Sequence, residues 1–441
     1  MALLHPNSGL AAATQLNLFD VPPTMAPTDE GMWVTHKPIT NVADSGHIEF
    51  RIQGNADYYL DLANTFLYVK AKITKADGSA LTADDSAAPT NLWMHSMFSQ
   101  VDAYLNDKLV TPSSNTYAYR AYLETFFNYG KEAQKTKLTG QCFYKDTAGQ
   151  MDNSKVTEPD VSYGLLKRHN LTKLSQSVEM MGGLHLDIMH MQRYLLNNVT
   201  LRLRMTRSKN EFCLMSASGT ADYKVVLQDI CLDVRRIRVA PEVINSHAAV
   251  LLRGNSAKYP LRRTDVLSFS VSQGQLNTRQ DNLFLGQLPQ ELIIGLVDSR
   301  AYNGAYDKNP YNFHHYDVNY INISIDGHQL PFEALTPDFT AGQYIRSFNT
   351  LHSCFDRGAH ADKGLSIDRE EYSKGYTLWA FNFTPDLTNG DMYELVKTGN
   401  LRLEIKFAKP LPHTVNVVVL AEFQNLMQMD MTRSVVFDFA K

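Results

Sequence analysis

Histidine and carboxylate side chains are the groups in this chain best suited to bind a metal. His314 and His315 are adjacent, and Asp317 follows two residues after the second histidine. Neighbouring side chains on a strand point to opposite faces, so only one of these histidines could share a metal with Asp317. His185 and His190 are five residues apart, which fits neither a helical i, i+4 pair nor one strand face. Polar loops explain both patterns better, and we expect no metal ligands.

Carboxylates gather in one later region, which holds Asp368, Glu370, Glu371 and Asp386. A glycosidase needs two such groups on facing elements, and nothing in this spacing places them so. A solvated loop is therefore the preferred interpretation. The sequence also has no Walker loop, GxGxxG or GxSxG motif. We expect no catalytic residues, no cofactor-binding residues and no enzyme activity.

Basic residues are dispersed along the chain. Arg235, Arg236 and Arg238 form the one small cluster, at the end of a strand-like segment, and no aromatic residues interleave it for base stacking. The formal net charge is −4 over 441 residues. An interface or solvent salt-bridge role is preferred for the cluster. We expect no direct sequence-specific nucleic-acid binding.

Nothing in the sequence predicts a membrane span or a secretion signal. The longest purely aliphatic run, Val417–Ala421, is far shorter than the ~20 residues that cross a bilayer. His5 and Pro6 interrupt the start of the chain, unlike a signal peptide. The four cysteines, 20% charged residues and 44% hydrophobic residues indicate a globular protein with reduced thiols.

Period-two patterning then indicates which elements carry these residues. The proline-containing residues 1–40 show no sustained periodicity and predict an extended N-terminal arm. From about residue 41, apolar and polar residues alternate, as in half-buried antiparallel strands. Helical spacing occurs at 115–131, and shorter helical stretches are predicted at 192–198 and 391–397.

The chain contains four ordered echoes between its halves. They match 48–54 with 267–274, 101–107 with 321–327, residues around 119–126 with 344–351, and 201–204 with 401–404. Each of the last two strands is followed by a long β-branched stretch, at 224–237 and 415–426. Echoes in a fixed order with slowly varying offset predict two copies of one domain with different loop lengths.

The predicted fold class is all-β, with two tandem jelly-roll β-sandwiches (a double jelly roll) and a few short helices in loops. Few segments alternate helix and strand, and each copy is long enough for eight short strands with long loops. The expected organisation is an arm at 1–40, jelly roll 1 at 41–240, a linker at 241–258 and jelly roll 2 at 259–441.

Several stretches together resemble the capsid-like proteins of Maverick/Polinton elements, adintoviruses and adomaviruses. No one stretch is diagnostic, but their ordered sum spans most of the chain. They are Leu16–Thr24, Ile48–Ile52, Tyr59–Leu62 with Thr65, Tyr259–Arg263, Asn282–Pro289, Gly295–Asp298 with Ala301–Gly304, Asn309–Phe313, Gly375–Phe381, Thr384–Leu387 and Ala421–Phe423.

The resemblance implies a major capsid (hexon) protein of a double-stranded DNA virus or an integrated element. Such proteins form pseudo-hexameric homotrimers that tile an icosahedral shell. The implied partners are neighbouring capsomers, penton and minor capsid proteins, and the implied location is the virion, assembled in the host nucleus or cytoplasm. This chain is compact, so its outer loops should be short. Two alternatives remain open at this point: a carbohydrate-binding or glycosidase-like β-sandwich protein, and a minor capsid (penton) protein.

Overall fold

The first jelly roll is built from strands in the first half of the chain. The computed structural model describes residues 7–8, 14–19, 21–22, 24–42, 46–156, 158–217, 222–284, 286–329, 333–355, 364–385 and 392–437. The eight strands of the first sandwich are β1 (Thr28–His36), β2 (Ile48–Ile52), β3 (Tyr58–Lys75), β5 (Phe98–Leu105), β6 (Lys108–Leu109), β7 (Val178–Gly183), β8 (Leu201–Arg207) and β10 (Tyr223–Val239).

The second jelly roll repeats this set after a connecting helix, α6 (Pro241–Leu252). Within the described ranges its eight strands are β11 (Ala257–Val271), β12 (Asn277–Gln280), β13 (Glu291–Asp298), β14 (Val318–Ile325), β15 (His328–Gln329), β16 (Leu378–Asn382), β17 (Leu401–Phe407) and β18 (Val415–Met429). A short strand, β19 (Val435–Phe437), pairs with the end of β18.

Sheet topology shows that the two halves have the same fold. The described strands of the first half form sheets of order β1-β10-β3-β7 and β2-β8-β5-β6, and those of the second form β11-β18-β13-β16 and β12-β17-β14-β15. In both halves one sheet therefore contains the first, eighth, third and sixth strands, and the other contains the second, seventh, fourth and fifth. This is the antiparallel jelly-roll arrangement, and the predicted double jelly roll is confirmed.

Helices and short strands fill the connections. In jelly roll 1 they are β4 (Ala88–Pro89), α1 (Trp93–Ser96), α2 (Tyr117–Asn128), α3 (Lys131–Lys135), η2 (Lys137–Gln141), α4 (Tyr163–Thr172), η3 (Lys173–Ser175), η4 (Asp187–His190), α5 (Asn210–Cys213) and β9 (Leu214–Met215). In jelly roll 2 they are α7 (Ser299–Asn303), α8 (Ile345–Phe355) and α9 (Arg369–Tyr372). A 3-10 turn, η1 (Thr14–Leu16), precedes β1.

Strand register confirms the echo between the two leucine strands. Leu203 on β8 pairs with Ala103 on β5, and Leu403 on β17 pairs with Ile323 on β14. Both leucines are buried, at 0% and 1% exposure. Alternation places every second side chain of a strand on one face, which is why both leucines point into their sandwich cores.

The hairpins after β5 and β14 are also duplicated, down to their hydrogen bonds. Asn106 and Asp326 both have positive φ angles, of 46° and 50°, in the tight turns that hairpins favour. The side-chain oxygen of Asn106 accepts from the Thr200 backbone N–H, at 2.9 Å. The side-chain oxygen of Asp326 accepts from the Asn400 backbone N–H, at 2.8 Å. Each turn is thereby fixed to the start of the neighbouring strand.

Three sequence predictions need correction. The echo of 48–54 with 267–274 is wrong, because β2 corresponds in topology to β12, whereas 267–271 ends β11. Residues 192–198 contain no helix, and neither do residues 392–397, the described part of the other predicted helix. Gln424 hydrogen-bonds to residues 392 and 394 of that segment, which holds it extended against β18.

The boundaries of the predicted arm and linker also differ from the structure. Residues 28–36, inside the predicted arm, form β1, which pairs along its length with β10. The sequence does not alternate clearly between apolar and polar residues here, because the apolar Trp33 points outward between the half-buried Met32 and Val34. Pro241–Leu252 of the predicted linker is helical, and β11 begins at Ala257.

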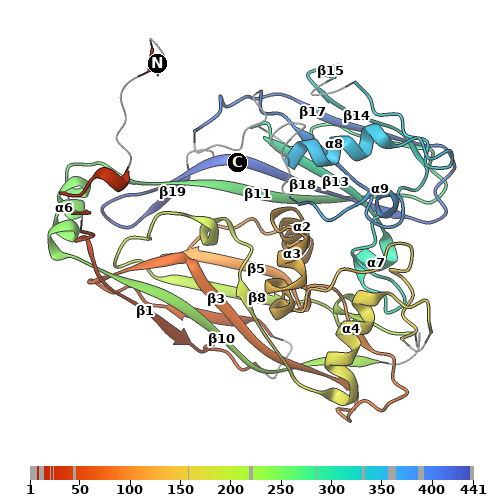
Figure 1. Cartoon of the computed structure of the whole chain (residues 1–441), viewed down its shortest axis with the longest axis horizontal. Coiled ribbons are helices and arrows are strands. Elements are labelled where there is room, and N and C mark those ends of the chain that lie inside the picture. The colour runs from red at the N-terminus through yellow and green to blue at the C-terminus, as the bar shows by residue number, and fades with distance from the viewer. Residues whose placement is uncertain are drawn as a thin grey trace.

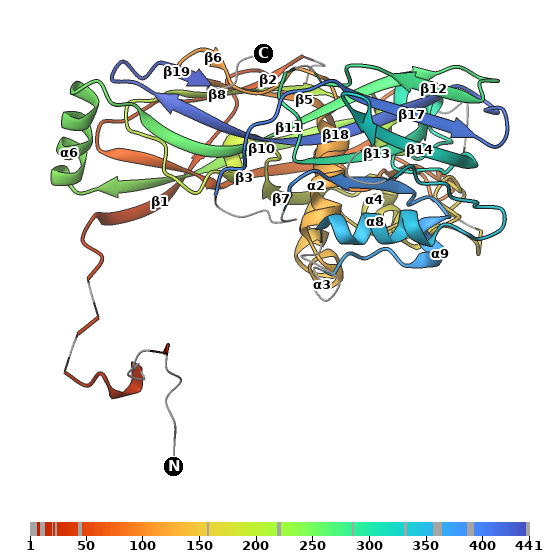
Figure 2. The same cartoon turned by 90° about the horizontal axis from the view of Figure 1, so that it is seen from above.

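The two sandwiches lie one above the other, with α2 between them near the middle of the molecule (Figure 1). Helix α6 lies at one end and α8 toward the other, and both views agree on this separation (Figure 2). The sheet that contains β11, β18 and β13 faces jelly roll 1, whereas β1 and β10 lie on the side of jelly roll 1 away from jelly roll 2 (Figure 1).

Candidate functional site

The junction between the jelly rolls is organised around α2. Eleven consecutive residues of this helix, Tyr117 to Phe127, are buried, as expected for a helix enclosed on all sides. Tyr122 stacks on Tyr311 of jelly roll 2 with ring centroids 4.1 Å apart. Phe126 stacks on Tyr376 at 5.5 Å. Offset aromatic pairs of this kind add about 0.5–1.5 kcal/mol beyond their area burial, so the junction is a hydrophobic core that joins the two domains.

A charged network lies inside this core. The Arg120 guanidinium donates to Glu124, at 2.7 Å, and to Asp187, at 2.6 Å. It also donates to the Thr264 carbonyl of β11, at 3.3 Å. Burial opposes ionisation of Glu124, but Arg120 and His185 outweigh it and lower the pKa of this carboxyl. A buried ion pair is costly to break, because the remaining charge has no counter-ion, so Arg120 ties α2 to jelly roll 2.

A second buried ion pair supports the same junction from the long loop after η2. Arg168 on α4 donates to Asp146 at 2.8 Å, and both side chains are almost completely buried. Asp146 also accepts from Asn309 of jelly roll 2, at 3.1 Å, and its carbonyl accepts from the Tyr376 hydroxyl, at 2.7 Å. The segment that contains Asp146 and Arg168 therefore forms a bridge between the domains.

A cleft of about 800 Å3 opens beside α2 at the junction. Glu291 on β13 and Glu422 on β18 lie directly opposite each other on this wall. Burial and the neighbouring Glu291 raise the pKa of Glu422 to about 8. Arg262 on β11 lies 3.9 Å from Glu422. The Glu422 carboxyl in this cleft can therefore gain or lose its proton near neutral pH.

The sheet of jelly roll 2 that faces the junction is apolar on its outer side. Ile293 pairs with Leu420 on one side and with Ala380 on the other. These three residues are at most 3% exposed and belong to the same hydrophobic cluster as the α2 aromatic residues. This sheet is therefore buried on both faces, and α2 is part of what covers its outer face.

The corresponding outer face in jelly roll 1 is more open. Aligning the ends of β7 and β16 matches Ile293 with Tyr68, which pairs with Cys231 and with Met181. Cys231 is buried, but Met181 is 44% exposed. In the next row, Lys70 forms an ion pair with Glu179, at 3.1 Å, and both side chains are exposed. The same surface that is covered in jelly roll 2 is thus solvent-facing in jelly roll 1.

Helix α8 differs from α2 in the same way. The sequence echo aligns Ile345, Arg346 and Asn349 of α8 with Arg120, Ala121 and Glu124 of α2. The three α2 residues are buried. Ile345 is 51% exposed, and the other two α8 residues are exposed as well. The chain thus exposes one face of helix α8 in jelly roll 2 and the outer face of the β1-β10-β3-β7 sheet in jelly roll 1.

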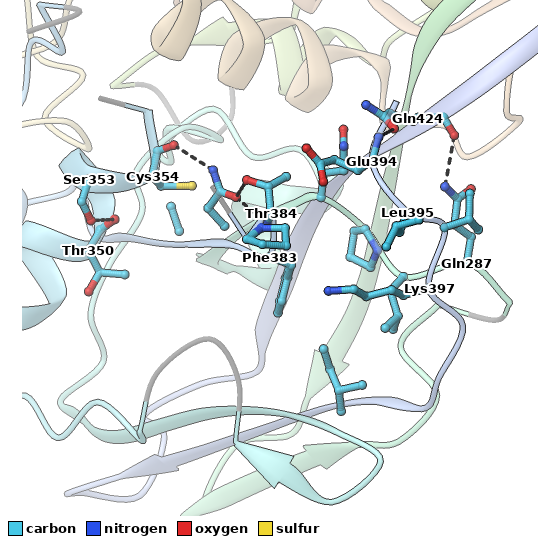
Figure 3. A pocket seen from close by; sticks show the side chains of 18 residues that line it. Gln287, Thr350, Ser353, Cys354, Phe383, Thr384, Glu394, Leu395, Lys397 and Gln424 are labelled. Carbon is cyan, nitrogen blue, oxygen red and sulfur yellow. Dashed lines mark hydrogen bonds between the residues drawn. The ribbon is translucent and has the colours of Figure 1, made fainter. Parts of the chain in front are cut away.

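An apolar pocket of about 620 Å3 lies between α8 and the segment before β17. Among its described lining residues, Glu394 and Lys397 are the only charged side chains. Asn382 hydrogen-bonds to Thr384, at 2.5 Å, and Gln424 accepts from the residue 394 backbone N–H (Figure 3). Its polar groups bond to one another, so the pocket offers a hydrophobic surface and no paired acid and base.

The N-terminal segment before β1 exposes large apolar side chains. Leu16, Leu18, Phe19 and Val21 are 71–95% exposed. The described residues of this segment extend away from both jelly rolls (Figure 2). Contiguous exposed apolar residues mark interaction sites, so this segment is suited to bind another molecule.

The structure separates the histidines that the sequence singled out at 314–317. His315 lies 3.4 Å from Asp317 and stacks on Phe339. Asp317 also binds Lys409, at 2.8 Å. His314 packs against Tyr316 instead. His315, Asp317 and Lys409 thus form a small group of ion pairs at a loop.

The other histidine pair meets a third residue that sequence reasoning missed. The turn η4 folds the chain back, so that the rings of His185 and His190 lie 6.2 Å apart. Glu124 of α2 accepts from His185 at 2.7 Å. The five-residue spacing was misleading because a 3-10 turn lies within it. Arg120 and Glu124, an i, i+4 pair inside an aromatic helix, are the signal that could have indicated a buried polar site.

The carboxylates at 368–371 have a local structural role. Asp368 caps α9 by accepting from the backbone N–H groups of Glu370 and Glu371, each at 2.8 Å. Glu371 completes the capping box and pairs with Lys145 of jelly roll 1, at 2.6 Å. Asp386 lies outside the described residues. The described members thus cap a helix and bridge the domains.

The arginine cluster on β10 belongs to the open sheet. Arg235 stacks on Trp33 of β1, with the guanidinium carbon 4.3 Å from the ring centroid, and lies 3.6 Å from Asp61. Arg236 is partly buried, and Arg238 is exposed. These side chains diverge from one another, in agreement with the preferred salt-bridge interpretation for Arg235.

The cysteine thiols are buried. Cys142, Cys213 and Cys231 are buried and form no disulfide, and burial raises the pKa of Cys142 and of Cys213 to about 12. In the described part of the chain, no helix has the length and apolar character needed to span a bilayer.

Comparison with known proteins identifies the fold. No protein-family model matches the chain. An uncharacterised protein of Caenorhabditis elegans, F54H12.2, is 28% identical over 403 residues, which cover 89% of this chain and 93% of that protein.

Solved structures with the same fold come from viruses. A chain in the structure of the Sputnik virophage has a TM-score of 0.63 at 10% identity, over 98% of this chain and 93% of its own. The Faustovirus major capsid protein has a TM-score of 0.58 at 10% identity, over 94% and 92%. The mavirus major capsid protein has a TM-score of 0.54 at 13% identity, over 100% and 97%. The chain therefore has, over nearly its whole length, the fold of these viral major capsid proteins.

Proposed function

We propose that this chain is a viral major capsid protein that forms pseudo-hexameric homotrimers and acts by association, without catalysis. The observation that carries this proposal is the duplication: two sandwiches with identical strand order stand side by side in one chain. Three such chains provide six similar units around a threefold axis. The capsid-type fold supports the same role.

The junction within one chain supplies a template for the contact between chains. Inside the chain, α2 of jelly roll 1 packs on the outer face of the jelly roll 2 sheet. The equivalent surfaces, α8 and the outer face of the β1-β10-β3-β7 sheet, remain uncovered. A head-to-tail contact between them would repeat the internal junction, and a repeated heterologous contact closes into a ring when its rotation permits.

We assign Ile345 of α8 and Trp33 of β1 to the two sides of this contact. Ile345 aligns with Arg120, which reaches Thr264 on β11. By sheet register, Thr264 corresponds to Thr35, so the β1 row beside it contains Trp33, which is 53% exposed. Large exposed apolar side chains such as these become the buried centre of stable interfaces.

The remaining assignments concern the assembled particle. The location is the virion, with the trimer contacting neighbouring capsomers, penton and minor capsid proteins. The exposed apolar residues Leu16, Leu18, Phe19, Val21 and Met25 are the part suited to reach such a neighbour. The Maverick/Polinton, adintovirus and adomavirus group is the proposed source, on the sequence resemblance. Assembly takes place in the host nucleus or cytoplasm.

Mass photometry of the purified chain at nanomolar concentration tests the trimer. The expected peak lies at three times the chain mass of 49.8 kDa, and a lone monomer peak in mild buffer would overturn the proposal. Ile345→Asp should convert the trimer to monomers, because it buries a charge at the contact. The matched control is Leu252→Asp on α6, because Leu252 is 73% exposed and helix α6 lies far from α8 in both views (Figures 1 and 2). The control should remain trimeric.

A further inference from the structure

Three potential metal ligands converge at the edge of the junction cleft. Glu124 comes from α2, His185 precedes η4 by two residues, and His190 is the last residue of η4. One ligand atom from each residue lies within 4.8 Å of the other two. Glu124 and His185 are buried, and His190 is exposed to the cleft. The set therefore combines two fixed ligands with one that solvent can reach.

Hydrogen bonds behind the ligands orient them. Glu124 Oε1 accepts from Arg120, at 2.7 Å, so its other oxygen, Oε2, faces His185 Nδ1. His185 Nε2 lies 3.2 Å from the Thr125 hydroxyl oxygen. In the metal-free chain the Nδ1–H of His185 donates to the carboxylate, and a bound cation would take the place of this proton. Nε2–H would then donate to the Thr125 hydroxyl, and outer hydrogen bonds of this kind are usual around metal-bound histidine.

The geometry requires little movement. Ligand atoms around a tetrahedral Zn2+ at ~2.0–2.1 Å lie about 3.4 Å apart. The observed separations, from 2.7 Å between Glu124 and His185 up to 4.8 Å at most, bracket this value. The cleft of about 800 Å3 beside His190 leaves room for ion entry and for water as the fourth ligand.

We propose that Glu124, His185 and His190 form a Zn2+ site at the junction of the two jelly rolls. Two imidazoles and one carboxylate favour zinc over Mg2+ or Ca2+, which prefer all-oxygen ligands. The bound ion ties α2 to the η4 turn, and both of these elements pack against β11. Zinc thereby strengthens the contact between the domains. The site goes beyond the capsid role, and its test does not depend on assembly.

Isothermal titration of the purified, EDTA-dialysed chain with Zn2+ tests the site. The expected result is saturable binding of one ion per chain, with a rise in melting temperature from mass action. His190→Gln should abolish the binding and the zinc-dependent rise while leaving the metal-free melting temperature unchanged. The matched control is His328→Gln, because His328 is exposed on β15, and this variant should bind zinc normally.

Titration with Co2+ provides a second, independent measurement. Tetrahedral nitrogen and oxygen ligation should give visible absorption bands in the wild-type chain, and excess Zn2+ should remove them. Absence of saturable zinc binding, or equal binding by His190→Gln, would show that a proton alone joins Glu124 and His185, and would overturn the proposal. Should His190→Gln fail to fold, the wild-type cobalt spectrum decides the question.

Discussion

The two jelly rolls have the same strand order but opposite surroundings. In jelly roll 2 the sheet that contains β11, β18, β13 and β16 has buried apolar side chains on both faces, beside the Glu291 and Glu422 pair, and packs against α2. In jelly roll 1 the equivalent sheet has one face open, with ion pairs such as Lys70 with Glu179. Topology thus fixes where a surface lies, and side-chain chemistry decides whether that surface is buried in a core or exposed to solvent.

Removal of β1 should have the largest effect on the stability of jelly roll 1. Deletion of residues 1–40 removes the edge strand that pairs with β10, and we expect it to cost much of the ~5–15 kcal/mol that stabilises such a domain. Deletion of residues 1–24 spares β1 and should change stability by no more than about 0.5 kcal/mol. Thermal unfolding and limited proteolysis of both variants provide the measurement. Equal melting of the two variants would show that β1 contributes nothing.

Arg120 tests the covered junction of jelly roll 2. Arg120→Ala leaves Glu124 and Asp187 buried without a counter-ion, and we expect a loss of ~3–5 kcal/mol in urea unfolding at pH 7. The control is Arg300→Ala, which removes an ion pair whose two side chains are 61% and 48% exposed and should cost under about 1 kcal/mol. A similar loss in both variants would mean that the junction network is no stronger than a surface pair.

Equivalent core positions test whether the two sandwiches are equally well packed. Leu203→Ala and Leu403→Ala should each cost ~2–5 kcal/mol, because both leucines are buried on matching strands. Arg402→Ala, beside one of them, removes a half-exposed side chain and should cost far less. Differential scanning calorimetry gives the values. A neutral result for Leu403 alone would contradict the equivalence.

Much of the fold was predictable because strands and duplication leave periodic signals. Leu203 and Leu403 were placed correctly from alternation alone, and the α2 helix from its aromatic spacing. β1 was missed because an edge strand with half-buried inward residues alternates weakly. The first echo failed because short apolar alternation recurs in any strand and does not identify which strand it is.

The junction was less predictable than the strands. Arg120 and Asp187 are 67 residues apart within jelly roll 1, and Asp146 and Asn309 are 163 apart in different jelly rolls, so only tertiary packing brings each pair together. His185 and His190 were judged by their spacing along the chain, and the turn between them changed their geometry. Local patterns predict elements well, but contacts between distant elements depend on loop paths that a single sequence does not specify.

Glu422 marks a difference of a single residue pair between the two jelly rolls. By register, Glu291 and Glu422 of jelly roll 2 occupy the positions of Phe66 and Asp233 in jelly roll 1. Asp233 faces an aromatic ring and accepts from Thr35, whereas Glu422 faces a second carboxylate. Burial and this second carboxylate raise the pKa of Glu422.

The sign of the pH effect follows from this raised pKa. The pKa of Glu422 is about 8 in the folded chain, against an ordinary value of 4.5. Between these values the folded state binds a proton that the unfolded state lacks, so stability falls as pH rises through this window. Arg120, Arg262, Glu124 and Glu291 are the charged groups that face this carboxyl.

Glu422→Gln removes the charge and should flatten this fall. We expect a gain on the order of 1–3 kcal/mol at pH 8.5 and almost none at pH 4.5, from melting curves across the range. Glu404→Gln on β17 is the control, because this carboxylate pairs with Lys406 at 3.3 Å and is 31% exposed. Its profile should run parallel to that of the unmodified chain. Parallel profiles for both variants would show that Glu422 is ionised throughout, and that the two jelly rolls do not differ in proton binding at this position.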